Sequence, residues 1–273
     1  MAAADLLVII LDLILRHIPI IYREYFLFLE SIPVCNIHAV LVYAVTDCSV
    51  WFTVTFTIDR FVAICFQKLK SKYCTEKTAA VDLGTVTVLS CLKNITWYFI
   101  LTGYYQLVNE PWFCWVTTRV YDSRVWATIE LLHYILTPGV AFMLILLLNA
   151  FTVRHILVNS RGRRRLRAQK HWESRRDPEM ESRRKSIILL LSISASFILL
   201  WGMFMIYSIW FRMQQLLISV YLPVFLGEMG FMLQLLSCCT NTSIYAITQT
   251  QYREQLKNML KYPFTPIVKF MQR

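Results

Sequence analysis

The chain has 273 residues, of which 57% are hydrophobic and 16% charged, and its mean hydropathy is +0.49. Soluble globular domains carry about 25% charged residues, so this composition excludes that class and favours a membrane protein. The net charge of +11 would suit a nucleic-acid partner. Twelve of the lysines and arginines, however, lie between positions 154 and 185. Basic residues gathered between apolar spans set membrane topology, so we expect no nucleic-acid partner.

Six apolar runs are long enough to cross a bilayer core of ~30 Å. They cover residues 2–22, 32–66, 78–101, 125–153, 186–211 and 218–248. Residues 249–261 differ, because they are amphipathic and basic, which is typical of a helix that lies on the membrane surface. We therefore expect an all-α membrane protein, with a helical bundle over residues 1–248 and a cytoplasmic amphipathic helix with a short tail over residues 249–273.

The loops after the second, fourth and sixth spans are the basic ones. The positive-inside rule therefore places these three span ends and the C-terminus in the cytoplasm. The same rule places the start of the chain in the cytoplasm too.

The second span carries an acid in its interior, Asp47, and a charged pair near its end, Asp59-Arg60. From Cys35 to Arg60 a helix rises ~37 Å, at ~1.5 Å per residue. A slightly tilted helix would place Cys35 at one membrane face and Arg60 at the other, where charge is tolerated. Taken alone, this pattern also fits a membrane helix that ends in an interfacial arginine.

A cysteine at the outer end of a span and Asp-Arg-aromatic at its inner end resemble the third helix of rhodopsin-like G-protein-coupled receptors. In that resemblance Asp59, Arg60 and Phe61 stand for the Asp-Arg-Tyr motif, on which G-protein coupling depends. Phe61 replaces the usual tyrosine. The resemblance makes Cys35 the disulfide cysteine, and Cys114, on the same outer side, is its candidate partner.

Asp5 lies inside the first apolar run, in Ala-Ala-Asp-Leu. It resembles the aspartate of the receptors' second helix, which helps to bind a sodium ion. Ser49 and Asn241 would supply further oxygens. A carboxylate inside a membrane needs a cation or hydrogen-bond donors, so a hydrogen-bonded acid without an ion is the alternative. Beyond this sodium ion we expect no cofactor.

Three further marks of the family follow in chain order. Pro138 stands for the proline of the fifth helix, and Trp201 for the tryptophan of Cys-Trp-x-Pro, with Met203 in place of the proline. The last span ends Asn241-Thr-Ser-Ile-Tyr245, which resembles Asn-Pro-x-x-Tyr. The missing proline predicts a sixth helix without the usual kink.

Amine receptors carry an aspartate in the third helix where this chain has Val42. We therefore expect a small zwitterionic or aromatic ligand rather than a simple amine, since an unpaired ammonium is costly in a pocket of low dielectric constant. Asp47 and Glu228 are the other acids near such a pocket. Asp47 could instead pair with His133 across the bundle. Aromatic residues at helical spacing would line the pocket or belong to the core: Tyr43, Trp201, Phe204 and Phe231.

The resemblance implies a non-enzymatic receptor of the plasma membrane that passes a small-molecule or peptide signal to a heterotrimeric G protein. Thr-Ile-Asp-Arg-Phe-Val-Ala-Ile-Cys, Leu-Leu-Trp and the Asn-Thr-x-Ile-Tyr ending look most like orphan receptors grouped with those for aromatic amino acids. Compared with seven-helix receptors the chain looks one helix short at its front. A truncated, non-signalling receptor fragment is thus an alternative. A transporter should show inverted repeats with broken helices, which 7 Gly and 8 Pro do not favour.

Basic residues at the start of the fifth span predict raised ligand-independent signalling. The family places an acid there as a second restraint on the coupling arginine, but this chain has Arg183, Arg184 and Lys185. Positive charges near Arg60 would destabilise the resting arrangement, in which this arginine is restrained.

Overall fold

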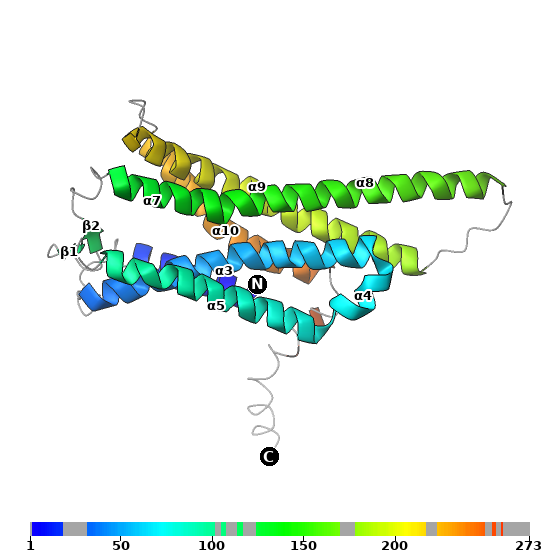
Figure 1. Cartoon of the computed structure of the whole chain (residues 1–273), viewed down its shortest axis with the longest axis horizontal. Helices are drawn as coiled ribbons and strands as arrows, with labels where there is room; N and C mark the ends of the chain where they lie inside the picture. The colour runs from blue at the N-terminus through cyan, green and yellow to red at the C-terminus, as the bar shows by residue number, and fades with distance from the viewer. Residues whose placement is uncertain are drawn as a thin grey trace, which may run out of the picture.

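A computed structural model describes residues 2–18, 32–101, 105–107, 114–116, 124–169, 178–216, 223–248, 253–254 and 258. The chain order of the elements is α1 Ala2–Val8, η1 Ile9–His17 (π-helical), α3 Ile32–Cys65, α4 Gln67–Tyr73, α5 Glu76–Leu101, β1 Tyr105–Leu107, β2 Cys114–Val116, α7 Arg124–Tyr134, η4 Ile135–Gly139 (π-helical), α8 Val140–Gln169, α9 Pro178–Leu216 and α10 Val224–Thr248. The long helices form an elongated bundle in which α9 and α10 are tilted against α3 and α5, and the short α4 lies at an angle to them (Figure 1).

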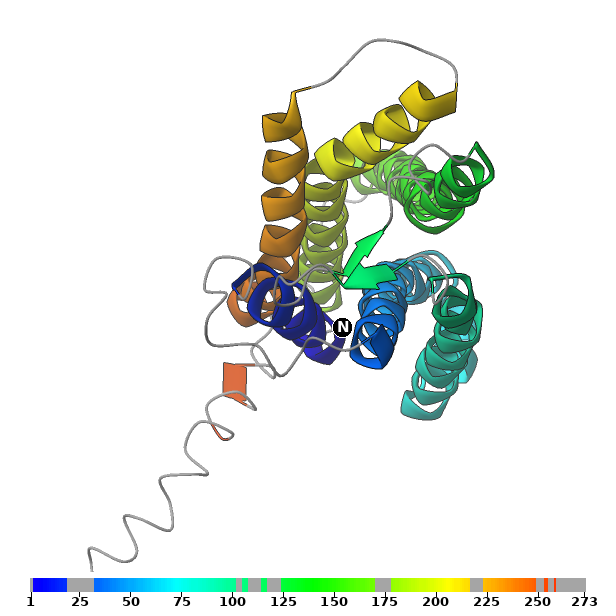
Figure 2. The ribbon, with the colours of Figure 1, turned by 90° about the vertical axis from the view of Figure 1, so that its left-hand side faces the viewer.

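Helix α3 lies at the centre of the bundle and contacts α1, α5, α8 and α9 (Figure 2). Its 34 residues extend ~51 Å, which is more than a bilayer core. Val50 and Val54 are buried on one side of it and pack with Phe197 and Trp201 of α9. A helix that satisfies its own backbone hydrogen bonds can be apolar on almost every side and still be stable in lipid.

Two ends of the bundle can be distinguished (Figure 1). The hairpin end carries β1 and β2, which pair antiparallel with Leu107 opposite Cys114. The opposite end, called the α4 end below, carries α4, the C-terminal end of α8 and the N-terminal end of α9. The hairpin adds two short strands to the all-α fold: Tyr105–Leu107 and Cys114–Val116 contain aromatic and β-branched residues, which favour strands.

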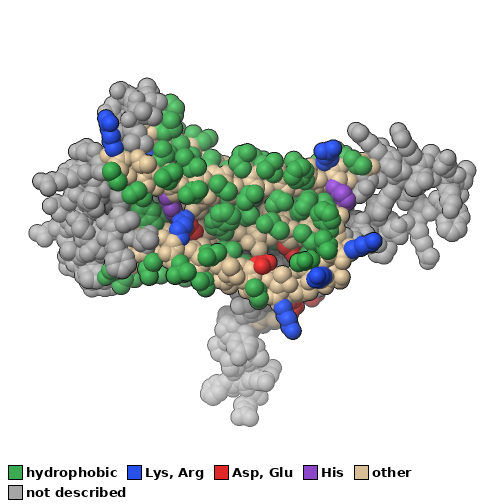
Figure 3. All heavy atoms as spheres, viewed as in Figure 1, with side chains coloured by type: hydrophobic (Ala, Val, Ile, Leu, Met, Phe, Trp, Pro, Cys, Tyr) green, Lys and Arg blue, Asp and Glu red, His purple; other side chains and the backbone are tan. Residues whose placement is uncertain are grey.

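Helices coincide with the described parts of all six predicted spans. Three of them are long and apolar enough to cross a membrane by length and composition within the described residues: Ile37–Cys65, Ala127–Val158 and Ile187–Gln214. Hydrophobic side chains cover the middle of the face seen in Figure 3. Many large apolar residues on the outer sides are more than half exposed, as lipid-facing residues are: Val81, Leu199 and Ile247 among them.

The basic block between the fourth and fifth spans is more helical than expected. Helix α8 continues to Gln169 and α9 already begins at Pro178. Arginine, glutamate and methionine form helices readily, and proline is favoured at the first helical position, so both helices extend past the apolar spans. The predicted amphipathic helix over 249–261 falls almost wholly outside the described residues.

Candidate functional site

The Asp59–Arg60 pair lies near the α4 end of α3. Arg60 Nη2 is 3.0 Å from Asp59 Oδ2, and both side chains are about one-third exposed. The guanidinium also lies over the ring of Phe56, 5.3 Å from its centroid. The ring of Phe61 packs edge-on against Phe66. The pair is therefore partly exposed at this end of the bundle.

Cys74, between α4 and α5, packs against the same pair. Its Sγ lies 3.7 Å from the backbone oxygen of Asp59. Burial, together with the neighbouring Asp59, raises the pKa of the Cys74 thiol, so the thiol stays protonated at neutral pH.

A second polar group joins α1, α3 and α10. Ser49 Oγ donates to Asp5 Oδ1 at 2.5 Å, and Asn241 Nδ2 donates to Asp5 Oδ2 at 3.3 Å. All three side chains are buried. Asn241 Oδ1 has no hydrogen-bond partner among the described residues. The group thus offers a carboxylate, a hydroxyl and an amide oxygen, which are the ligands that hard cations prefer; the side chain of Tyr245 lies outside the described residues.

Trp201 joins α9 to α10. Its Nε1 donates to Ser237 Oγ at 2.8 Å, and its ring packs against Phe197 and Phe204. The helix is continuous from Pro178 to Leu216, in keeping with Met203 in place of proline.

Pro138 lies in η4, the π-helical segment between α7 and α8. Thr137 and Pro138 are both buried there. A proline lacks the N–H that would close a helical hydrogen bond, and here the chain passes through it in a π-helical turn. The segment packs against α9 as well as α3.

The predicted pocket residues separate into two places. Tyr43 stacks on Trp97 with 5.0 Å between centroids, and His133 meets both rings edge-on at 5.3 and 5.6 Å. Phe204 lies nearby, edge-on to Tyr134 of the same helix as His133. These rings line the hairpin half of the bundle between α3, α5 and α7.

The remaining candidates lie elsewhere. Phe231 packs against Val8 and Leu235 between α1 and α10. Glu228 is exposed, and Val42 is half-buried on α3. The packing of Phe231 thus involves α1 and α10, whereas the rings around His133 belong to α3, α5 and α7.

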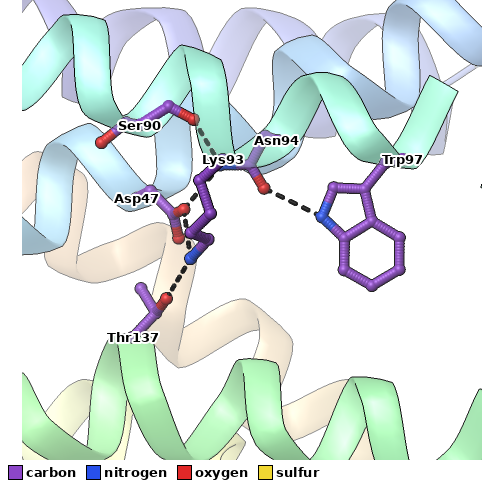
Figure 4. Close-up of polar contacts among 6 residues, drawn as sticks. All are labelled: Asp47, Ser90, Lys93, Asn94, Trp97 and Thr137. Atoms are coloured by element: carbon purple, nitrogen blue, oxygen red, sulfur yellow. Dashed lines mark hydrogen bonds and ion pairs between the residues drawn. The ribbon is translucent and has the colours of Figure 1, made fainter.

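Asp47 has a partner that the sequence reasoning missed (Figure 4). Lys93 Nζ lies 2.6 Å from Asp47 Oδ2, and Asn94 Nδ2 donates to the same oxygen at 2.6 Å. Trp97 Nε1 in turn donates to Asn94 Oδ1 at 3.0 Å. The alternative of an Asp47–His133 pair is wrong. The Asp47 carboxylate contacts Lys93 and Asn94 of α5, whereas the His133 ring packs on Tyr43 and Trp97. A lysine inside an apolar run was the available signal, since such a charge needs a buried partner.

A further buried ion pair joins Arg212 of α9 to Glu130 of α7. It lies in the hairpin half and was also missed, because Arg212 directly follows the fifth predicted span, residues 186–211. The signal for this pair was Glu130, the lone acid in the apolar run 125–153, because a charge in such a run needs a partner. The side chains of Cys35 and Cys114 lie outside the described residues, and their pairing stays a prediction.

A family profile described as 7 transmembrane receptor (rhodopsin family) matches residues 1–245. No curated protein matches the chain significantly.

Proposed function

We propose that this chain, which belongs to the rhodopsin family of seven-transmembrane receptors, passes a signal from an extracellular ligand to a heterotrimeric G protein at the α4 end of its bundle. The observation that carries the proposal is the Asp59–Arg60 pair at that end. A partly exposed arginine held by its neighbouring acid is available to a partner once that hold is released. Asp59 is then the restraint of the resting receptor, and Arg60 the residue on which coupling depends.

The α4 end is then cytoplasmic and the hairpin end extracellular, in the plasma membrane. Exposed lysines on α4 support this orientation, because basic residues gather on the cytoplasmic side: Lys68, Lys70 and Lys72. The hairpin and the aromatic group around His133 then lie on the side from which a ligand arrives. The Asp5 group lies between the two sites and is the proposed place of a sodium ion.

The ligand that these residues favour is small and zwitterionic or aromatic. The rings of Tyr43, Trp97 and His133 can stack on an aromatic group. Asp47 is already held by Lys93, so it offers no unpaired acid to a simple ammonium. A ligand shifts the receptor toward signalling only by binding the active arrangement better than the resting one.

The test is ligand-independent G-protein activation in cells that express the chain, measured with energy-transfer sensors for each G-protein class at matched surface expression. We expect a signal above empty vector, because Arg183, Arg184 and Lys185 stand where the family has a restraining acid. Arg60→Ala should abolish that signal.

Arg124→Ala is the matched control, because Arg124 is an exposed arginine at the hairpin end. It should leave basal activation unchanged. A chain that reaches the surface but activates no G-protein class above vector, with or without ligand, would refute the proposed function, as would full activity of Arg60→Ala.

A further inference from the structure

Thr137 makes a side-chain contact unlike those of most helical threonines in this chain. Its Oγ1 lies 2.5 Å from Lys93 Nζ, in another helix. Other threonine hydroxyls donate to the carbonyl four residues earlier in their own helix, the usual way to satisfy a hydroxyl in an apolar helix. They are Thr53, Thr55, Thr57, Thr85, Thr87, Thr128 and Thr152.

Lys93 connects three elements at once (Figure 4). From α5 its ammonium reaches Asp47 of α3 and Thr137 of η4. The lysine side chain is 41% exposed although its carboxylate partner is only 1% exposed. In a membrane the methylene stem therefore lies against lipid, while the charged head turns inward to the polar groups.

The polar contact of Lys93 with Asp47 and Thr137 lies next to a layer of aromatic rings. In each of the three helices an aromatic residue lies four positions from the polar one, on the hairpin side: Tyr43, Trp97 and His133. Residues four apart share a helix face, and these three rings pack on one another. Anything that enters from the hairpin end meets the rings before it meets Lys93.

We propose that Lys93 is a latch: it fixes the π-helical η4 segment to Asp47 in the resting receptor, and its release favours signalling. Asp47, which the latch holds, lies on α3 together with the Asp59–Arg60 pair, so one helix carries a partner of both restraints. Lys93 and Thr137 are positioning residues: their contact holds the η4 turn that carries Pro138 in place. The signalling half of this inference rests on the proposed function; the structural half does not.

The sharpest variant is Thr137→Val, which keeps the shape of the side chain and the Lys93–Asp47 ion pair but removes the hydroxyl. We expect faster hydrogen exchange of the η4 amides, those of residues 135, 136, 137 and 139, without faster exchange in the core of α9. Basal G-protein activation at equal surface expression should rise about fivefold, at the lower end of ordinary coupling factors. Thr128→Val is the matched control, because that exposed hydroxyl bonds only to its own helix.

Lys93→Arg should keep both readouts near wild type, since a guanidinium can still reach both partners. Lys93→Met leaves Asp47 without its cation and can fail to fold, so it is made together with Asp47→Asn. Adding Thr137→Val to this double variant should change neither readout further, because the bond is already absent.

The outcomes separate the two proposals. Unchanged η4 exchange in Thr137→Val refutes the latch whatever the signalling. Faster exchange with unchanged basal activation refutes its role in signalling. If the wild-type chain activates no G protein, the proposed function and the signalling role fail together, and the exchange data alone decide whether Lys93 holds η4.

Discussion

Arg212 of α9 and Glu130 of α7 form an ion pair in the hairpin half of the bundle, with 13% and 9% of their side chains exposed. The guanidinium also lies over the ring of Phe211. Two charges so far from bulk water need each other, because each alone would be desolvated without compensation. The pair therefore ties the hairpin ends of α7 and α9 together.

Breaking this pair should destabilise the protein more than removing both charges. Arg212→Met or Glu130→Gln alone should lower the free energy of unfolding by about 2 kcal/mol, below the ~3–5 kcal/mol of fully buried pairs, since some exposure remains. The double variant should recover at least half of that loss. Thermal unfolding of detergent-purified protein measures the difference, and strictly additive losses would contradict the pairing.

Gly230 permits a close approach of α10 to α9. A Cβ at Gly230 would lie 2.9 Å from the Cα of Phe204, whereas a Cβ at Gly202 meets nothing within 4 Å. Gly230→Ala should lower thermal stability, because one backbone must move away from the other. Gly202→Ala, the matched control, should be neutral or stabilising by up to about 1 kcal/mol, the helix-propensity gain of alanine. Equal effects of the two substitutions would argue against this packing.

The Asp5 group should give the protein a sodium-dependent stability. A cation that binds only the folded state raises the unfolding temperature as its concentration rises. We expect NaCl, but not choline chloride at the same ionic strength, to stabilise the wild type. Asp5→Asn should remove the difference between the two salts, since it removes the carboxylate that Ser49 and Asn241 contact. A sodium effect that survives Asp5→Asn would place the ion elsewhere.

The proposed Cys35–Cys114 disulfide is open to a chemical test. It would tie the hairpin to the start of α3 and stabilise the fold by ~2–4 kcal/mol. Peptide mass spectrometry without reduction should find the two cysteines linked in surface-expressed protein. The described cysteines, such as buried Cys48 and Cys238, are free thiols and serve as internal controls. Finding Cys35 or Cys114 alkylated as a free thiol would exclude the bridge.

Apolar runs predicted most of the architecture because a membrane helix is defined by length and hydropathy alone. The meeting of Asp5, Ser49 and Asn241 was expected from the resemblance to the receptors' sodium site, and it agrees with the rule that a carboxylate in lipid needs polar partners. The helical extensions to Gln169 and from Pro178 were missed, since a helix former continues a helix beyond the membrane without any hydropathy signal.

The partners of Asp47 and Glu130 were missed for a different reason. Which face of α5 turns toward α3 depends on the rotation of one helix against another, and this rotation is set by packing across the whole interface. Sequence spacing places Lys93, Asn94 and Trp97 on a helix but does not say which of them meets Asp47. The two strands were missed because three-residue runs are too short for a pattern of alternation.

The ligand class can be tested by comparing a panel of plain amines with a panel of amino acids in the G-protein assay. We expect responses to aromatic amino-acid-like compounds and none to plain amines. Val42 offers no charge where amine receptors have an acid, and Lys93 already neutralises Asp47. Val42→Asp should add a response to amines, because it supplies an unpaired carboxylate. A nanomolar response of the wild type to a plain amine that survives Asp47→Asn and Glu228→Gln would contradict this account of the pocket.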